Sequence, residues 1–180
     1  MPQLLPEKYA WLATIGPLPR MVTEGLKELG TKEIGGAGNN KHILEWAKEV
    51  RQQAVYTADS IPWCGLFMAV ISKRAGKSSP SNPLWALNWA TMGKSVGQPI
   101  LGDILTFTRE SGGHVGIYIG EDKDTYHVLG GNQSDQVGFT RVYKRRLYAA
   151  RRPSFLFRMP PSAKAYILKT DGTPISTNEA

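Results

Sequence analysis

The chain has 180 residues and a formal net charge of +7 at pH 7, with 41% hydrophobic and 21% charged residues. These values are ordinary for a globular protein that is long enough to bury a core, and they exclude wholesale disorder. Cys64 is the only cysteine, which excludes an intramolecular disulfide framework and a cysteine-rich zinc site. The longest apolar run, Trp63 to Ile71, is too short to span a membrane, and the N-terminus lacks the pattern of a secretory signal.

The pattern of apolar residues divides the chain into three parts. Residues 1–18 are proline-rich and irregular, residues 19–158 form a single domain, and residues 159–180 are expected to be a flexible tail. Apolar spacing and end signals predict helices over about 19–29, 41–53, 62–74 and 83–92. Strands are predicted at 103–108, 114–119, 125–129, 137–143 and 147–151. Helices followed by hairpin-linked strands predict an α+β fold with an antiparallel sheet.

The excess of positive charge lies in one segment, residues 141–158, near the C-terminal end of the predicted sheet. This segment has no acidic residue, whereas the rest of the chain carries 15 residues of each sign. Such a stripe is typical of a protein with an anionic partner, namely nucleic acid, lipid head groups or an acidic wall polymer. It is equally typical of a solvated edge strand whose charges block edge-to-edge pairing. The basic residues are Arg141, Lys144, Arg145, Arg146, Arg151, Arg152 and Arg158.

Cys64 is the most informative single residue. It falls in the first turn of the third predicted helix, directly after Pro62 and Trp63. The N–H groups at a helix start stabilise a thiolate and offer donors to an oxyanion. The alternative is a buried and inert cysteine, which is the common case for a free thiol in an apolar run.

A nucleophilic cysteine needs a base, and the base needs a group that orients it. His114 opens a predicted strand after two glycines and is the best candidate base. Asn132 ends the next strand, where antiparallel pairing brings it beside His114, so its amide oxygen is expected to accept a hydrogen bond from Nδ1–H of His114. The alternatives are a structural histidine and a turn asparagine. His127 lies in the same strand and is a weaker candidate for the orienting group.

The fourth predicted helix carries Trp85, Asn88 and Trp89. These residues either pack in the core or form one wall of a substrate groove. We expect no bound metal and no cofactor, because no ligand-spacing motif is present and the glycine-rich loop at 35–38 lacks the features of a phosphate loop.

Cys64, His114 and Asn132, in this order, resemble the catalytic set of papain-like peptidoglycan hydrolases of the NlpC/CHAP class. The closer likeness is to a phage and prophage cell-wall hydrolase family, and it covers about residues 20–153. The motifs that carry it are the segments 29–34, 38–40, 59–64, 85–89, 113–116 and 129–133. The resemblance implies a papain-like fold, in which a helical N-terminal half packs its cysteine-bearing helix against an antiparallel sheet.

The resemblance also implies roles for individual residues. Cys64 is implied as the nucleophile, His114 as the general base and acid, and Asn132 as the third polar group. Many relatives have a serine after the nucleophile where this chain has Gly65, and many have an upstream tyrosine near the oxyanion, for which Tyr56 is the candidate here. The residues expected to bind substrate are Trp63, Trp85, Asn88, Asn39 and Gln133.

The function expected from these features is hydrolysis of an amide bond in peptidoglycan by a cysteine-dependent phage lysis enzyme. The bond lies either in the peptide stem or at the sugar–peptide junction. Such a protein, expected to be a monomer, is made in the host cytoplasm without a signal peptide and reaches the wall after release or delivery. Two alternatives stay open: a nucleic-acid-binding module without catalysis, and a thiol peptidase that acts on protein.

Overall fold

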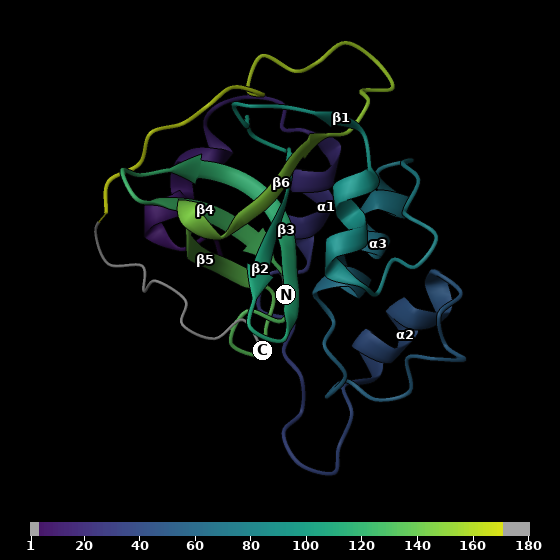
Figure 1. Cartoon of the computed structure of the whole chain (residues 1–180). Coiled ribbons are helices and arrows are strands. Elements are labelled where there is room, and N and C mark those ends of the chain that lie inside the picture. Colours follow the sequence, from purple (N-terminus) through teal and green to yellow (C-terminus); the bar gives the residue numbers. More distant parts are fainter. Residues whose placement is uncertain (1–3, 171–180) are drawn as a thin grey trace.

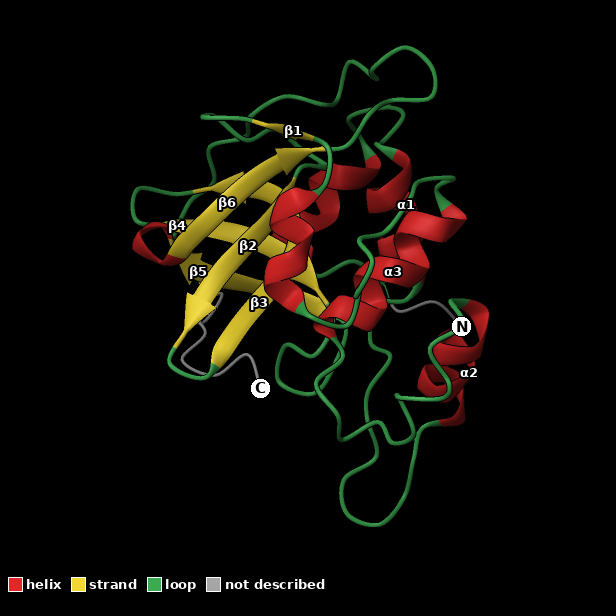
Figure 2. Cartoon of the chain, turned by 45° about the vertical axis from the view of Figure 1, so that its right-hand side comes forward, coloured by secondary structure: helices red, strands yellow, loops and turns green. Residues whose placement is uncertain are grey.

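The computed structural model describes residues 4–170 and contains one antiparallel sheet with helices packed against it. The strands lie in the order β1-β6-β2-β3-β4-β5, and every neighbouring pair is antiparallel. Figures 1 and 2 show the three α-helices on one side of this sheet. The strands are β1 (Lys94–Ser95), β2 (Ile104–Arg109), β3 (Gly112–Glu121), β4 (Thr125–Gly130), β5 (Gly138–Tyr143) and β6 (Leu147–Arg152). The α+β class expected from the sequence is therefore confirmed.

The helices follow the sequence signals closely, with one change of type. They are α1 (Arg20–Lys27), α2 (Lys41–Glu49) and α3 (Cys64–Arg74). Asn40 caps α2, since its side chain accepts a hydrogen bond from the backbone N–H of His42. The fourth predicted helix is instead a short 3₁₀ helix, η2 (Ala86–Thr91). Two further 3₁₀ helices are η1 (Glu7–Ala13) and η3 (Lys144–Arg146).

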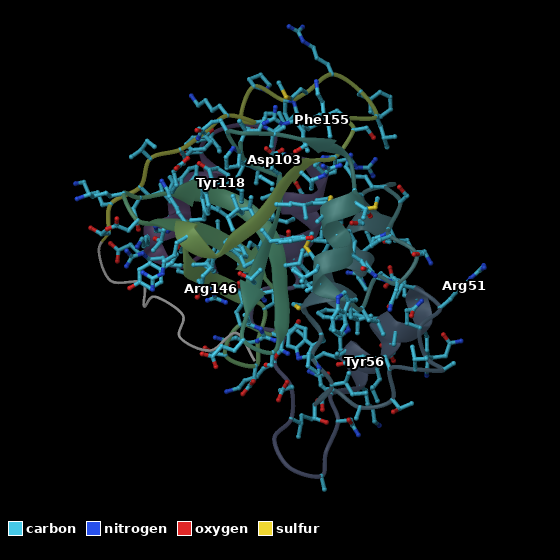
Figure 3. All side chains as sticks on the ribbon, in the orientation of Figure 1. Arg51, Tyr56, Asp103, Tyr118, Arg146 and Phe155 are labelled. Atoms are coloured by element: carbon cyan, nitrogen blue, oxygen red, sulfur yellow. The ribbon has the colours of Figure 1, made fainter. Side chains whose placement is uncertain are left out.

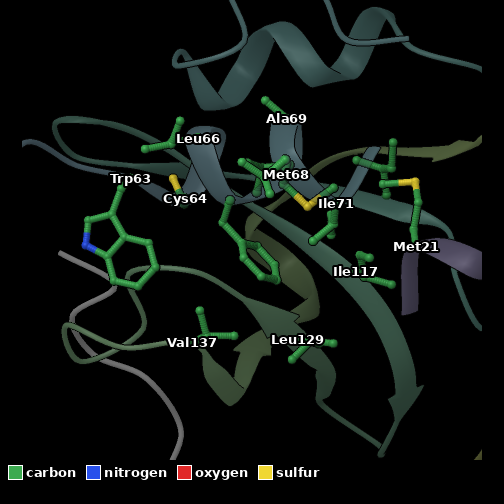
Figure 4. Close-up of a cluster of buried hydrophobic side chains, with 14 of the residues drawn as sticks. Met21, Trp63, Cys64, Leu66, Met68, Ala69, Ile71, Ile117, Leu129 and Val137 are labelled. Atoms are coloured by element: carbon green, nitrogen blue, oxygen red, sulfur yellow. The ribbon is translucent and has the colours of Figure 1, made fainter. Parts of the chain in front are cut away.

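The core lies between α3 and the sheet. Every residue of α3 from Cys64 to Ser72 is buried, in agreement with a helix that is apolar on all sides. Figure 4 shows this helix with the side chains that surround it, among them Ile117 of β3 and Leu129 of β4. A second, smaller apolar cluster fills the opposite face of the sheet around Phe107 and Tyr118. Buried apolar side chains thus lie on both faces of the sheet, and α3 packs against β3 and β4.

A network of charged side chains ties the three helices together. The carboxylate of Glu28, just after α1, accepts hydrogen bonds from His42 of α2 and from Arg74 of α3. Arg74 also pairs with Glu49 at the end of α2, at 2.8 Å. Burial raises the pKa of Glu28, but the hydrogen bonds from His42 and Arg74 outweigh it, so its pKa lies below the usual value. Glu28 is therefore ionised, and its carboxylate links the C-terminal end of α1 to α2 and α3.

The two ends of the described chain pack on the sheet. Tyr9 of η1 stacks on Phe139 of β5 with ring centroids 3.9 Å apart, and its hydroxyl lies 2.8 Å from Nδ1 of His127. Near the other end, Tyr166 packs against Trp11, and the N–H of Leu168 donates to the carbonyl of Glu121. Residues 162–168 thus contact the body although they fall in the expected flexible tail, and residues 171–180 of that tail lie outside the described residues.

Most side chains of the basic segment, residues 141–158, have partners within the molecule. Arg141 pairs with Asp122, Lys144 with Glu121 and Arg152 with Asp103. Arg151 donates to the carbonyls of Met92 and Gly93, while the guanidinium of Arg145 lies 4.3 Å from the ring of Tyr143. Three of the seven basic residues of this segment are therefore neutralised by carboxylates of neighbouring strands and turns, and the anionic partner stays a prediction.

Within the described residues, no helix is both long and apolar enough to cross a bilayer.

Candidate active site

Cys64 is the first residue of α3, and only 5% of its surface is exposed. Burial raises the pKa of the Cys64 thiol above its usual value. Hydrogen bonds from the backbone N–H groups of Val115, Gly65 and Cys64 itself act in the opposite direction, as does the positive charge of Arg109. The donors expected at the helix start are thus present, but burial dominates and keeps the thiol protonated at neutral pH.

His114 lies near the start of β3, is fully buried, and is oriented by an amide side chain. Its Nε2 lies 3.0 Å from Oε1 of Gln133. The Nε2 of Gln133 donates to the carbonyls of Val128 and Gly138, so the amide cannot be flipped and its Oε1 is the acceptor. Nε2 of His114 therefore carries the hydrogen, and Nδ1 is the basic nitrogen of the neutral ring.

The orienting residue is thus Gln133 and not Asn132, which corrects the sequence-based assignment. Asn132 lies in the same loop, with a positive φ of 55°. Its Oδ1 is buried and has no hydrogen-bond partner among the described residues. His127, the weaker candidate, is engaged elsewhere, because its Nε2 bonds to Asp122 and its Nδ1 faces Tyr9.

Close contacts join the start of α3 to β3 and to the loop between β4 and β5. The N–H of Val115, the residue that follows His114 in β3, bonds to the sulfur of Cys64, so the thiol lies against this strand. The loop that carries Gln133 packs on the start of α3, where a Cβ at Gly131 would lie 2.5 Å from Cβ of Phe67. Residues from α3, β3 and the β4–β5 loop therefore meet at one point.

The segment before η2 crosses this point and explains why a glycine follows the cysteine. A Cβ at Gly65 would lie 2.3 Å from the carbonyl oxygen of Pro83 and 2.6 Å from that of Leu84. At Gly113 of β3, a Cβ would meet the side chain of Leu87 in η2 at 2.6 Å. The position after the cysteine, which is serine in many members of the family that the sequence resembles, is thus closed to any side chain, and η2 is anchored to both α3 and β3.

A glycine-rich loop at 34–40 is held by Asp59, five residues before Cys64. The buried carboxylate of Asp59 accepts hydrogen bonds from the backbone N–H groups of Ile34 and Asn40. Its own N–H donates to Oδ1 of Asn39. The sequence shows an Asp-Ser turn and a glycine-rich loop, but their spacing along the chain does not reveal that the two meet.

Tyr56 supports the same loop and does not supply a free hydroxyl to an oxyanion. Its hydroxyl contacts the carbonyls of Asp59 and Ile61, at 3.3 and 3.2 Å. Burial, followed by the nearby carboxylates of Asp59 and Glu33, raises the pKa of Tyr56 far above its usual value. Figure 3 shows Tyr56 on the side of the molecule that carries α2. Its hydrogen is committed to the segment that leads into Cys64.

The expected substrate-binding residues divide into buried and accessible ones. Trp63 is fully buried beside Cys64, as Figure 4 shows, and its Nε1–H donates to Glu33, so it does not line a groove. Trp85 is 55% exposed and Asn39 is also exposed. Asn88 is half-buried and donates to the carbonyl of Asn82. Gln133 is buried and serves His114, while Trp89 is a core residue.

Among the described residues, no cluster of three or more His, Cys, Asp or Glu side chains is placed to hold a metal ion. A comparison with models of known protein families finds no match, and a comparison with curated proteins finds none either.

Proposed function

We propose that the chain is a cysteine-dependent hydrolase that cleaves an amide bond in bacterial peptidoglycan. Two contacts carry the proposal: the hydrogen bond from Nε2 of His114 to Gln133, and the bond from the N–H of Val115, the next residue of the same strand, to the sulfur of Cys64. A cysteine at a helix start, a histidine on an adjoining strand and an amide that fixes its tautomer form a Cys–His–amide set. The finer fold assignment, papain-like of the NlpC/CHAP type, is part of the proposal and is supported by α3 packing on the sheet.

The proposed reaction begins from a neutral thiol and a neutral imidazole. As the sulfur of Cys64 attacks the amide carbon, its proton passes to Nδ1 of His114. The backbone N–H groups at the start of α3 stabilise the negative charge that develops on the carbonyl oxygen. His114 then protonates the leaving nitrogen, the C–N bond breaks, and a thioester remains on Cys64. A water molecule, deprotonated by His114, hydrolyses the thioester and regenerates the thiol.

Because the pKa of the thiol is raised, we propose that the proton leaves the sulfur during the attack, and not in an earlier step that forms a free thiolate. Gln133 keeps Nδ1 as the proton acceptor throughout, because Nε2–H stays bonded to its oxygen. The buried oxygen of Asn132, which has no described partner, is proposed to accept an N–H of the bound substrate. Asn132 thus keeps a place in the proposed site, with substrate binding as its role.

Peptidoglycan as the substrate rests on the resemblance of the ordered motifs to phage cell-wall hydrolases. The exposed ring of Trp85 and the exposed residue Asn39 in the loop at 34–40 are proposed to contact a sugar or peptide chain. Action after release or delivery to the wall, as in phage lysis, is part of the same proposal. The bond is either the sugar–peptide amide or one within the peptide stem.

Digestion of purified Gram-negative peptidoglycan, followed by mass spectrometry of the fragments, tests the proposal. The wild type is expected to release fragments whose masses identify the bond, and Cys64→Ala is expected to release none. Met68→Leu, a volume-conserving change in the same buried helix, is the matched control and is expected to stay active. Equal activity of the wild type and Cys64→Ala would assign Cys64 a structural role. Inactivity of the wild type on walls from several hosts would refute the substrate.

A further inference from the structure

A cavity of about 160 Å³ lies at the C-terminal end of α3, at the opposite end of this helix from Cys64. Its walls come from the start of α1, from the turn after α3 and from the segment that follows β6. Most of the lining is apolar, with Met21, Ala75 and Leu156 among the contributors. The proposed active site does not include any of these residues.

The segment that follows β6 exposes a cluster of large apolar side chains next to this cavity. Within four consecutive residues, Leu156 is 55%, Phe157 82% and Met159 47% exposed. Figure 1 shows the segment as the uppermost loop of the molecule, and Figure 3 marks Phe155 at its base. Neighbouring apolar side chains are rarely left this exposed unless they meet another apolar surface.

Basic side chains surround the apolar tip, and acidic ones are absent from it. Arg20, Lys77 and Arg158 line the cavity, none of the lining residues is acidic, and the chain from 141 to 170 has no Asp or Glu. No ion pair within the described residues involves these three side chains. Within residues 4–170, the ammonium of Lys77 interacts with two neutral groups of the segment after β6, the carbonyl of Ser154 and the ring of Phe155. Burial and the positive charge of Arg20 lower the pKa of Lys77.

From this arrangement we propose that residues 155–159 dock the protein on an anionic lipid bilayer. Leu156, Phe157 and Met159 enter the interface, and the cations of Arg20, Lys77 and Arg158 contact lipid phosphates. An apolar tip ringed by cations matches the two layers of such a surface, hydrocarbon below and negative charge above. A lipid phosphate beside Lys77 also relieves its repulsion from Arg20.

The proposed lipid-binding surface consists of residues outside the proposed active site, so it does not depend on the proposed hydrolase activity. It has a consequence for orientation, however, because α3 has 11 residues and is about 16 Å long. A bilayer at the C-terminal end of α3 leaves Cys64 at the end that points away from the lipid. A protein bound in this way presents its thiol site to material that lies beyond the membrane surface.

Co-sedimentation with vesicles tests the proposal. One set of vesicles contains phosphatidylcholine alone, and the other contains phosphatidylcholine mixed with phosphatidylglycerol. We expect binding to the anionic set only. Phe157→Ser is expected to weaken it roughly ten-fold, through loss of buried apolar area. Arg158→Gln is expected to weaken it about five-fold, as for one charge near the surface. Matched controls elsewhere are Val55→Ser, also at an exposed apolar residue, and Lys123→Gln, and both are expected to bind like the wild type.

Three results would overturn the proposal. Equal binding to neutral and anionic vesicles would show that the basic side chains do not contribute to membrane binding. Unchanged binding of Phe157→Ser to anionic vesicles would mean that the apolar tip stays out of the bilayer and the surface only attracts anions. Absence of binding by the wild type, with peptidoglycan digestion intact, would leave the hydrolase proposal standing and assign the tip to a different partner.

Discussion

Gln133 is the residue on which the geometry of the candidate site depends most. Its amide joins three groups, because it donates to the carbonyls of Val128 and Gly138 and accepts from His114. We predict that Gln133→Ala lowers kcat roughly 100-fold, since the imidazole loses its fixed tautomer. It should also change the pH profile of kcat, which a purely structural role would leave in place. Steady-state kinetics on soluble peptidoglycan fragments across pH measures both effects.

Asn132→Ala is the matched comparison for this prediction. Its oxygen does not contact His114, so we expect a higher KM with a similar kcat and an unchanged pH profile. If Asn132→Ala lost kcat as Gln133→Ala does and Gln133→Ala did not, the orienting role would belong to Asn132.

The sequence identified the nucleophile and base candidates but not the residue that orients the base. Cys64 and His114 were found because a helix start and a strand start are marked by proline and glycine signals. Strand alternation ends at Gly130, and the loop beyond it has positive φ angles at Asn132, Ser134 and Asp135. Alternation therefore does not predict which of two adjacent amides meets the ring.

The buried thiol leads to a prediction about reactivity. Because burial raises the pKa of Cys64, alkylation by iodoacetamide should accelerate with pH and still be rising at pH 9.0, the usual value for a thiol. The label reports this one site, since the chain has a single cysteine. A rate that levels off at or below neutral pH would instead indicate a thiolate–imidazolium pair in the resting protein.

At the scale of elements, the junction between α3 and η2 depends on the absence of a side chain at Gly65. Gly65→Ser would introduce the residue common in the resembling family, but its Cβ would clash with the carbonyls of Pro83 and Leu84. We predict a loss of stability of about 1–3 kcal/mol and a loss of activity, as η2 is pushed from α3. Chemical denaturation measures the first effect and peptidoglycan digestion the second.

Gly97→Ser is the control, because a Cβ at Gly97 meets nothing within 4 Å. Equal stability of the two serine variants would contradict the close packing of η2 on α3.

Most elements could be predicted, whereas their partners could not. The helices and strands follow local patterns such as the Asn40 cap and the all-apolar third helix. The ion pairs of the basic segment could not be predicted, because its counter-charges, Asp103, Glu121 and Asp122, come from other parts of the chain. Only the strand order brings these carboxylates beside β5, η3 and β6, and local sequence carries little information about strand order.

For the whole molecule, the docking of η1 on the sheet links stability to pH. His127 accepts from the hydroxyl of Tyr9 and donates to Asp122, and both bonds suit a neutral ring. Burial lowers the pKa of His127 below its usual value of 6.5, although Asp122 opposes the shift. The unfolded chain therefore binds this proton more readily than the folded one, so stability falls as the pH drops below about 6.5.

The prediction is a lower Tm at pH 5.5 than at pH 7.5, with a smaller drop in His127→Gln. Glutamine can replace both hydrogen bonds without titrating, so the comparison isolates the proton on His127. Thermal unfolding followed by circular dichroism at the two pH values measures it. Identical drops in the two proteins would show that other groups set the acid sensitivity.

The central claim is that Cys64 forms a covalent bond to its substrate. The most direct measurement is the intact mass of the protein after brief mixing with soluble peptidoglycan fragments and quenching in acid. We predict an added mass equal to the acyl part of the substrate, located on the peptide that contains Cys64, and no added mass in Cys64→Ala. Fragment release by the wild type without such an adduct, together with equal release by Cys64→Ala, would contradict the claim.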